Sequence, residues 1–247
     1  MINNHSRLLK QIFVFLNLYL INPLTYGVTL PPVSNNQAGL TETQNIMYDS
    51  RDRYGNALTQ TIDAYDSTNN LIDHKNITNH FDPNNKPAEM KGNATSTDVK
   101  RWSTTDETTS MIEETITNTL SFDSFGNALV QQSDNYVAGL LAKRTDIVNS
   151  GIDARGDAGL QTITTSQTDA LGANLEVTSY QVMTRRSFDT SHNVTDQLIL
   201  TYSDSTMKDL KDVQEIRSSG FTSSGVASSP AKIASLPLFC KSNVSCI

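Results

Sequence analysis

The sequence predicts an all-β protein in which antiparallel β-hairpins form an extended or curled open sheet with flexible termini. Three observations support this prediction. A turn motif that begins with Asp recurs along the middle of the chain, the segments between turns alternate apolar and polar residues, and helix signals are sparse. Apolar residues make up 37% of the chain, below the ~45–50% of typical domains. The net charge of 19 − 26 = −7 argues against a nucleic-acid-binding protein.

Residues 1–27 are typical of a secretory signal peptide. Arg7 and Lys10 give a positive start, residues 12–21 form an apolar run, and Thr25 and Gly27 place small residues at −3 and −1 of a cleavage site. The apolar run is shorter than the ~20 residues that a membrane-spanning helix needs. A buried core helix is the alternative interpretation. A signal peptide predicts export from the cytoplasm.

The turn motif is clearest in two segments, 52–60 (DRYGNALTQ) and 123–131 (DSFGNALVQ), which are identical at six of nine positions. Looser copies begin at Asp66, Asp82 and Asp189, and weaker ones at Asp153 and Asp169. The spacings 123 − 82 = 41 and 153 − 123 = 30 each leave room for a further degenerate copy. A repeated motif of this kind indicates an array of similar supersecondary units.

The residue types of the motif explain how it turns the chain. Asp accepts a hydrogen bond from the backbone two residues further on. Three residues after it stands a residue type that tolerates positive φ. That residue is Gly55, Asn69, Asn85, Gly126, Gly156, Gly172 or His192. This pattern predicts a type I turn followed by a left-handed residue, the usual three-residue hairpin loop.

The segments between the turns predict strands. Residues 58–64, 112–122 and 194–202 alternate with a period of two, and β-branched Thr is abundant in the chain. Met207, Leu210, Val213 and Ile216 recur at a spacing of three. For residues 207–216, a helix and a last strand are equal interpretations.

These features divide the chain into four parts. Residues 1–27 are the signal peptide, 28–47 an extended leader that contains Pro31 and Pro32, and 48–217 the repeat domain. Residues 218–247 are a Ser/Gly-rich linker and C-terminal tail. The tail contains Cys240 and Cys246, for which a small disulfide loop and two unpaired thiols are both open.

An aromatic residue followed by Asp, and a turn that ends in Gly-Asn, resembles the YD repeat of RHS-type bacterial proteins. The matching pairs are Tyr65-Asp66, Phe81-Asp82, Phe122-Asp123 with Gly126-Asn127, and Phe188-Asp189. The resemblance covers residues 48–202 and implies hairpins that pair edge to edge into a long curling sheet. It also implies a large exported or cell-surface protein, some of whose relatives enclose a C-terminal toxin.

The chain departs from that family in several ways. The spacing of the motif is irregular, Arg51 and Thr168 replace the aromatic residue, and the tail has no recognisable toxin domain. Seven Asp positions are too few to close a shell. A short array leaves sheet edges unpaired, and such edges favour pairing with another chain.

The histidines do not predict a metal site. His74 and His80 lie six residues apart, which on a straight strand separates their Cα atoms by about 20 Å. His74 and His80, with Asp82 two residues beyond, therefore cannot share one ion unless the strand bends. We expect both histidines to be solvent-exposed strand residues. The Asp-rich turns do not fit the calcium-binding loop pattern either. No cofactor and no metal ligand are predicted.

No catalytic residue is predicted, and we expect a protein that is not an enzyme. Glu113 and Glu114 are adjacent and point to opposite faces of a strand, so they are not a glycosidase pair. The motifs of serine hydrolases, zinc proteases and P-loop proteins are missing from the sequence.

The aromatic residues allow two interpretations. Trp102 and the turn aromatics could be exposed and bind sugars, or the turn aromatics could pack between hairpins as the core of the repeat, which we favour. These aromatics are Tyr65, Phe81, Phe122 and Phe188. Four segments match the glycosylation acceptor pattern, which an Asn- and Thr-rich chain produces by chance. They begin at Asn76, Asn93, Asn193 and Asn243.

Together these observations predict an exported β-repeat protein with a structural or adhesive role at the cell surface or in a secreted assembly. A carbohydrate-binding or other recognition module is the alternative, and a secreted hydrolase is the third class. The expected partners are copies of the chain or a larger surface assembly that pairs with open sheet edges, with glycans as a further candidate. No membrane span is expected in the mature chain.

Overall fold

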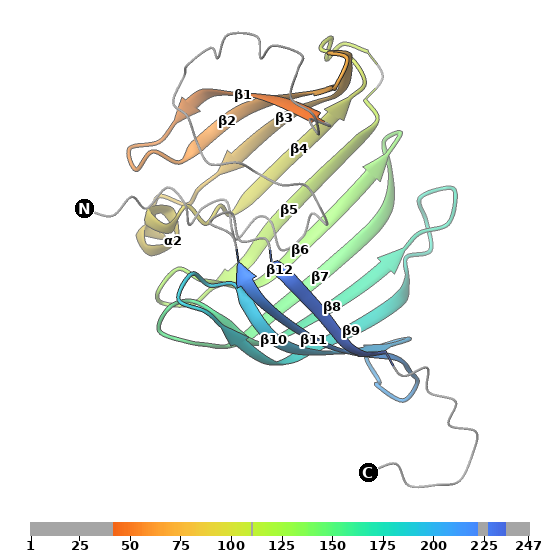
Figure 1. Cartoon of the computed structure of the whole chain (residues 1–247). Coiled ribbons are helices and arrows are strands. Elements are labelled where there is room, and N and C mark those ends of the chain that lie inside the picture. Colours follow the sequence, from red (N-terminus) through yellow and green to blue (C-terminus); the bar gives the residue numbers. More distant parts are fainter. Residues whose placement is uncertain (1–41, 110, 222–226, 236–247) are drawn as a thin grey trace, which may run out of the picture. The chain divides into compact units, whose positions relative to one another are not determined.

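The computed structural model describes residues 42–109, 111–221 and 227–235. Twelve strands form one antiparallel open sheet in sequence order, from β1 to β12 (Figure 1). The strands are β1 (Glu42–Arg51), β2 (Ala57–Asp66), β3 (Leu71–His80), β4 (Ser96–Trp102), β5 (Glu113–Phe122), β6 (Ala128–Val137), β7 (Leu140–Ile152), β8 (Ala158–Gln167), β9 (Glu176–Phe188), β10 (Val194–Tyr202), β11 (Leu210–Phe221) and β12 (Ala227–Ser235). The predicted all-β array of hairpins is confirmed.

The chain divides into two compact units. In the described residues, unit 1 holds β1 to β6, the start of β7, helix α2 (Lys86–Lys91) and residues 168–174. Unit 2 holds the rest of β7 and β8 to β12. The sequence predicted one repeat domain over residues 48–217, so the division was not foreseen.

The core of this fold is small. Among the described residues the buried apolar side chains are Ala57, Ala64, Ala88, Trp102, Ile147 and Ile199. Most strand side chains are half-buried, because each unit is essentially a single layer of strands. The strands make their extensive contacts with sequence neighbours in the sheet. Backbone ladders and cross-strand pairs must therefore supply much of the stability that a buried core supplies in two-layer domains.

Two expectations about secondary structure are corrected. The helix interpretation of residues 207–216 is wrong, since β11 pairs with β10 over Asp196↔Arg217 to Tyr202↔Leu210. Helix α2 was not predicted. Asn85 caps its start with a side-chain oxygen that accepts from the Ala88 N–H, and Gly92 ends it in the left-handed conformation.

The ends of the repeat domain also differ from the prediction. Strand β1 begins at Glu42, within the predicted leader. Strands β11 and β12 occupy part of the predicted linker and pair over Gln214↔Ser235 to Phe221↔Ala227. The signal peptide, Pro31, Pro32, Cys240 and Cys246 lie outside the described residues. None of the helices in the described ranges combines the length and the apolar character that crossing a membrane needs.

Candidate functional site: the aspartate turns and the His74 cluster

Each predicted turn is organised by one carboxylate. In the 52–56 turn, Asp52 Oδ1 accepts hydrogen bonds from the N–H groups of Tyr54 and Asn56, both at 2.8 Å. The Gly55 N–H donates to the Asp52 carbonyl at 3.1 Å, and φ of Gly55 is 85°. The Asn56 side chain then donates to Asp52 Oδ2 at 2.7 Å. Both carboxylate oxygens are therefore used inside the turn.

Six of the seven predicted turns have this full form, in which the Asp carboxylate accepts from the N–H groups two and four residues on. They begin at Asp52, Asp66, Asp123, Asp153, Asp169 and Asp189. His192 is left-handed, with φ of 66°, as its place in the motif predicts. Asn85 is not, since its φ is −100° and it caps α2 instead. The turn at Asp82 is therefore a shorter form that leads into the helix.

Two further turns of this kind are not among the predicted copies of the motif. Asp106 and Asp204 accept from the N–H groups of Thr108 and Thr206. The Asp106 turn fills one of the two long gaps between motif copies. The other gap holds a two-residue turn instead, at Ala138 and Gly139, whose φ angles are 50° and 77°.

Several of the turn carboxylates have a lowered pKa. The Asn70 N–H and the Thr68 hydroxyl, which donate to Asp66, lower the pKa of that carboxyl to about 2. The Ala173 N–H lowers the pKa of Asp169 in the same way, and the Thr108 hydroxyl lowers that of Asp106. Each of these groups is held as a carboxylate whose acceptors face its own backbone.

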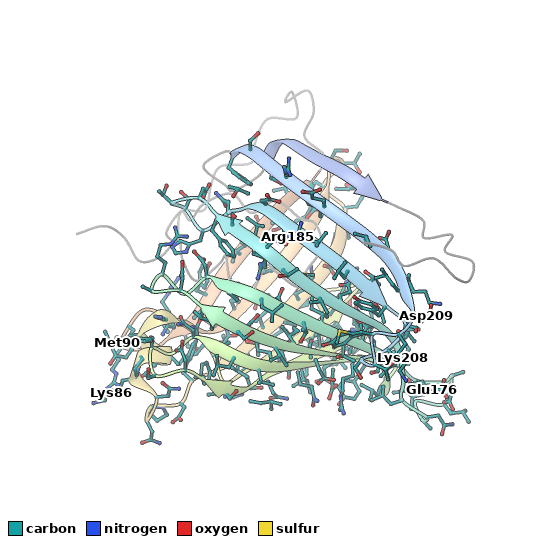
Figure 2. All side chains as sticks on the ribbon, turned by 90° about the horizontal axis from the view of Figure 1, so that it is seen from below. Lys86, Met90, Glu176, Arg185, Lys208 and Asp209 are labelled. Carbon is teal, nitrogen blue, oxygen red and sulfur yellow. The ribbon has the colours of Figure 1, made fainter. Side chains whose placement is uncertain are left out.

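Helix α2 lies at the end of the strands beside the two turns that share six of nine residues (Figure 1). The Asn56 side chain donates to the Glu89 carbonyl at 2.7 Å, and Arg53 pairs with the Glu89 carboxylate at 2.9 Å. On the other turn, Lys91 Nζ donates to Asn127 Oδ1 at 2.7 Å. Lys86 and Met90 point away from the strands (Figure 2). The helix thus joins two copies of one motif.

Gly126 marks the closest approach of helix and turn. A Cβ atom at Gly126 would lie 2.3 Å from the Ala88 nitrogen and 2.4 Å from the Pro87 carbonyl carbon. The Asn93 side chain donates to the Gly126 carbonyl at 2.7 Å. A glycine is required here both by the positive φ of 79° and by the space.

A second cluster surrounds His74. Asp63, His74 and Trp102 are direct neighbours across β2, β3 and β4, so their side chains share one face. His74 Nδ1 lies 2.5 Å from Asp63 Oδ1, and His74 Nε2 lies 3.3 Å from Glu107 Oε1. The Trp102 ring centroid is 5.8 Å from that of His74. The loop after β4 thereby closes over a buried imidazole.

Two carboxylates favour the protonated form of this imidazole. Burial lowers the pKa of His74, but hydrogen bonds with Asp63 and Glu107 raise it by more, so that the pKa lies above its ordinary value. The expectation of an exposed His74 is wrong, since 4% of its surface is accessible. His80 is exposed, as expected.

In unit 2, neighbouring turns contact each other directly. Arg155 donates to the Asp189 carbonyl at 2.8 Å, and His192 Nδ1 lies 2.8 Å from Asp157 Oδ1. Asp157 stands where four of the other copies of the motif have Asn, and His192 stands where the other copies have Gly or Asn. The two departures from the motif are therefore partners of each other.

The remaining candidates have separate partners. Glu113 contacts Arg101 and Asn135, whereas Glu114 contacts Lys100. Trp102 is buried, so the alternative interpretation in which Trp102 is exposed is wrong. The four turn aromatics are half-buried: Tyr65, Phe81, Phe122 and Phe188. Among the described residues, no group of three or more His, Cys, Asp or Glu is placed to hold a metal ion.

Three of the four glycosylation patterns fall on described residues, and their amide nitrogens already donate hydrogen bonds. Asn76 donates to Glu107, Asn93 to the Gly126 carbonyl and Asn193 to Asp189. Asn243 lies outside the described residues. These amides therefore have a role within the fold.

No protein-family model matches the chain, and no curated protein matches it.

Proposed function

We propose that the chain is an exported, non-enzymatic β-repeat scaffold with a structural or adhesive role at the cell surface or in a secreted assembly. One observation carries the proposal. The turn carboxylates, which are the most regularly repeated polar groups, accept hydrogen bonds from their own turns. Carboxylates that accept these hydrogen bonds stabilise the turns and are not free to act on a substrate.

The resemblance to YD-repeat proteins agrees with this role. In that family the hairpin is a building unit of exported and surface proteins. The hairpins of this chain follow one another in sequence order, which is the arrangement that the resemblance implies. The N-terminal pattern of Arg7, Lys10 and the apolar run at 12–21 supports export.

Export can be tested by labelling intact producing cells with an antibody to the chain. We expect label on unpermeabilised cells or chain in the medium. Leu16→Arg should abolish both, because a charge in the apolar run blocks signal function, and Leu16→Ile should leave both unchanged. Wild-type chain found only inside the cells would contradict the proposal.

A recognition module is the second candidate, and the turn tips favour it. Tyr54 and Phe125 occupy the same position of the repeated turn and are 37% and 71% exposed. Exposed aromatic rings are common at sites that bind sugars or proteins. If the chain recognises glycans, Tyr54→Ala combined with Phe125→Ala should abolish binding to an array of immobilised glycans. Leu171→Ala, at an exposed apolar side chain of another turn, is the control.

A hydrolase would need two carboxylates that face one cleft. Asp63 and Glu107 are brought together by the fold, but both are hydrogen-bonded to the buried His74. A hydrolase is therefore the third candidate function, after the scaffold and the recognition module.

A further inference from the structure

Strand β1 has a free edge. It is first in the strand order and pairs with β2 along one side, from Glu42↔Asp66 to Arg51↔Ala57. In the described residues no strand pairs with its other side. The register against β2 is unbroken from Glu42 to Tyr48 and becomes irregular after it. The edge therefore presents a regular stretch of seven residues.

The regular stretch from Glu42 to Tyr48 has no bulge and only one charged residue, so it lacks most of the features that usually prevent pairing. Residues 42–51 contain no Pro, Gly or Lys, and Ile46 and Met47 are 39% and 62% exposed. The strand at the other end of the order, β12, contains Pro230 and Lys232. Pro cannot donate to a ladder, and Lys on an edge disfavours pairing, so β12 has the composition of a protected edge. The available edge is that of β1.

We propose that β1 pairs antiparallel with β1 of a second copy of the chain, about a two-fold axis perpendicular to the sheet at Asn45. This inference rests on the proposed scaffold role and names the partner. Such an axis places the same face of both copies on the same side of the joined sheet. Paired residues are therefore both odd or both even, so their numbers sum to an even value.

The pairing uses the whole regular stretch when the numbers of facing residues sum to 90. It places Asn45 opposite itself, Gln44 opposite Ile46, Thr43 opposite Met47 and Glu42 opposite Tyr48. Glu42 is the one charged residue in the stretch, so no like charges face each other. Axes at Ile46 or Met47 would extend the pairing into the irregular residues after Tyr48. The register with its axis at Asn45 is therefore the one in which two β1 edges complement each other best.

Light scattering coupled to size-exclusion chromatography tests the partner. The full chain should elute with twice its own mass at micromolar concentration. Ile46→Lys should weaken dimerisation by at least about tenfold, because it places two positive charges close together across the axis. Ile72→Lys is the matched control, since Ile72 is 49% exposed on the interior strand β3. It should change dimerisation by less than about twofold.

A monomeric wild-type chain, or an equal loss with Ile72→Lys, would overturn the proposal. Disulfide trapping tests the register in a Cys240→Ser, Cys246→Ser background. Asn45→Cys should form a crosslinked dimer on oxidation, because facing residues lie within disulfide reach. Met47→Cys should not, because the two Met47 residues lie four positions apart across the axis, about 13 Å along the strands. The reverse result would overturn the register.

The surface-labelling experiment separates this inference from the function on which it depends. A chain that reaches the cell surface but stays monomeric refutes the β1 pairing alone. A chain retained in the cytoplasm refutes the scaffold role.

Discussion

At the scale of single residues, the Asp of each turn sets the local geometry because one carboxylate satisfies several backbone donors that the turn would leave free. Asp66 accepts from the N–H groups of Thr68 and Asn70 and from both of their side chains. An Asn at the first position could accept fewer of these bonds and would carry no charge. This explains why the acid is the most regular feature of the motif.

Gly126 gives a sharp test of the contact between turn and helix. Gly126→Ala adds a Cβ 2.3 Å from the Ala88 nitrogen at a φ of 79°. Gly139→Ala meets nothing within 4 Å at a φ of 77°. Both lose the glycine advantage of about 1–2 kcal/mol at positive φ, but only the first displaces α2. We expect the free energy of unfolding in urea to fall by about 3 kcal/mol for Gly126→Ala and by no more than about 2 kcal/mol for Gly139→Ala. Equal losses would contradict the packing of α2 on this turn.

His74 predicts a dependence of stability on pH. Its pKa in the folded protein is raised above the unfolded value of about 6.5. The contribution of His74 to the free energy of unfolding is therefore complete below about pH 6.5 and is lost as the pH rises through the folded pKa. The unfolding free energy should fall as the pH rises from about 6.5 through the folded pKa of His74, and His74→Gln should remove most of that change. At pH 6 the substitution should cost about 2 kcal/mol for the lost charge-assisted hydrogen bonds.

The single Trp provides the readout for His74. Trp102 lies 5.8 Å from the His74 ring, and a protonated imidazole quenches indole fluorescence. The emission should increase as the pH rises and His74 loses its proton. His80→Gln, on the same strand but exposed, should keep the wild-type titration. A flat fluorescence profile in the wild-type chain would refute the protonated pair.

At the scale of elements, the two most similar segments of the sequence both contact α2. The turns that follow β1 and β5 lie at the same end of an antiparallel array, as does the connection from β3 to β4 that contains the helix. Asn56 and Asn127 are buried there, whereas Asn70 in the turn after β2 is exposed. Burial against the helix gives a physical reason why both copies have Asn at this position.

Asn56 and Asn70 measure how much the helix contact contributes. Both amides donate to the carboxylate of their own turn, but Asn56 also donates to the Glu89 carbonyl. Asn56→Ala removes two hydrogen bonds of a buried amide, one to Asp52 and one to the Glu89 carbonyl, which keeps its bond from the Gly92 N–H. It should cost about 2 kcal/mol. Asn70→Ala exposes its former partners to water and should cost about 0.5–1 kcal/mol. Urea unfolding of the two variants provides the comparison, and a larger loss for Asn70→Ala would contradict this role of α2.

The sequence was informative where structure is local. The turns at Asp123 and Asp169 follow from residues within five positions of each other. Asp106 and Asp204 carry the signal Asp-x-Thr, which Asp66 shares, and this signal could have identified them. Helix α2 also had local signals in Asn85, Pro87 and Gly92, but six residues are too few for an apolar stripe.

The His74 cluster could not be predicted from the chain alone. Its three aligned residues come from β2, β3 and β4, so the cluster depends on the register of two strand pairs. Glu107 joins it from a loop 33 residues away from His74. A shift of one residue in either pair would move Asp63 or Trp102 to the other face. No motif spacing encodes that register.

At the scale of the whole molecule, a sheet whose strands contact mainly their neighbours should unfold locally. Stability in such arrays is a sum of unit and nearest-neighbour terms, so damage at one hairpin is felt chiefly by the strands beside it. Gly126→Ala should therefore raise amide hydrogen exchange in α2, β5 and β6. Exchange in β9 and β10 should stay at the wild-type rate, because those strands belong to unit 2. Mass spectrometry of peptic fragments measures the exchange of each of these segments. It is applied to Gly126→Ala and to Gly139→Ala, which serves as the comparison. Uniformly faster exchange across β9 and β10 would mean that the two units unfold as one cooperative structure.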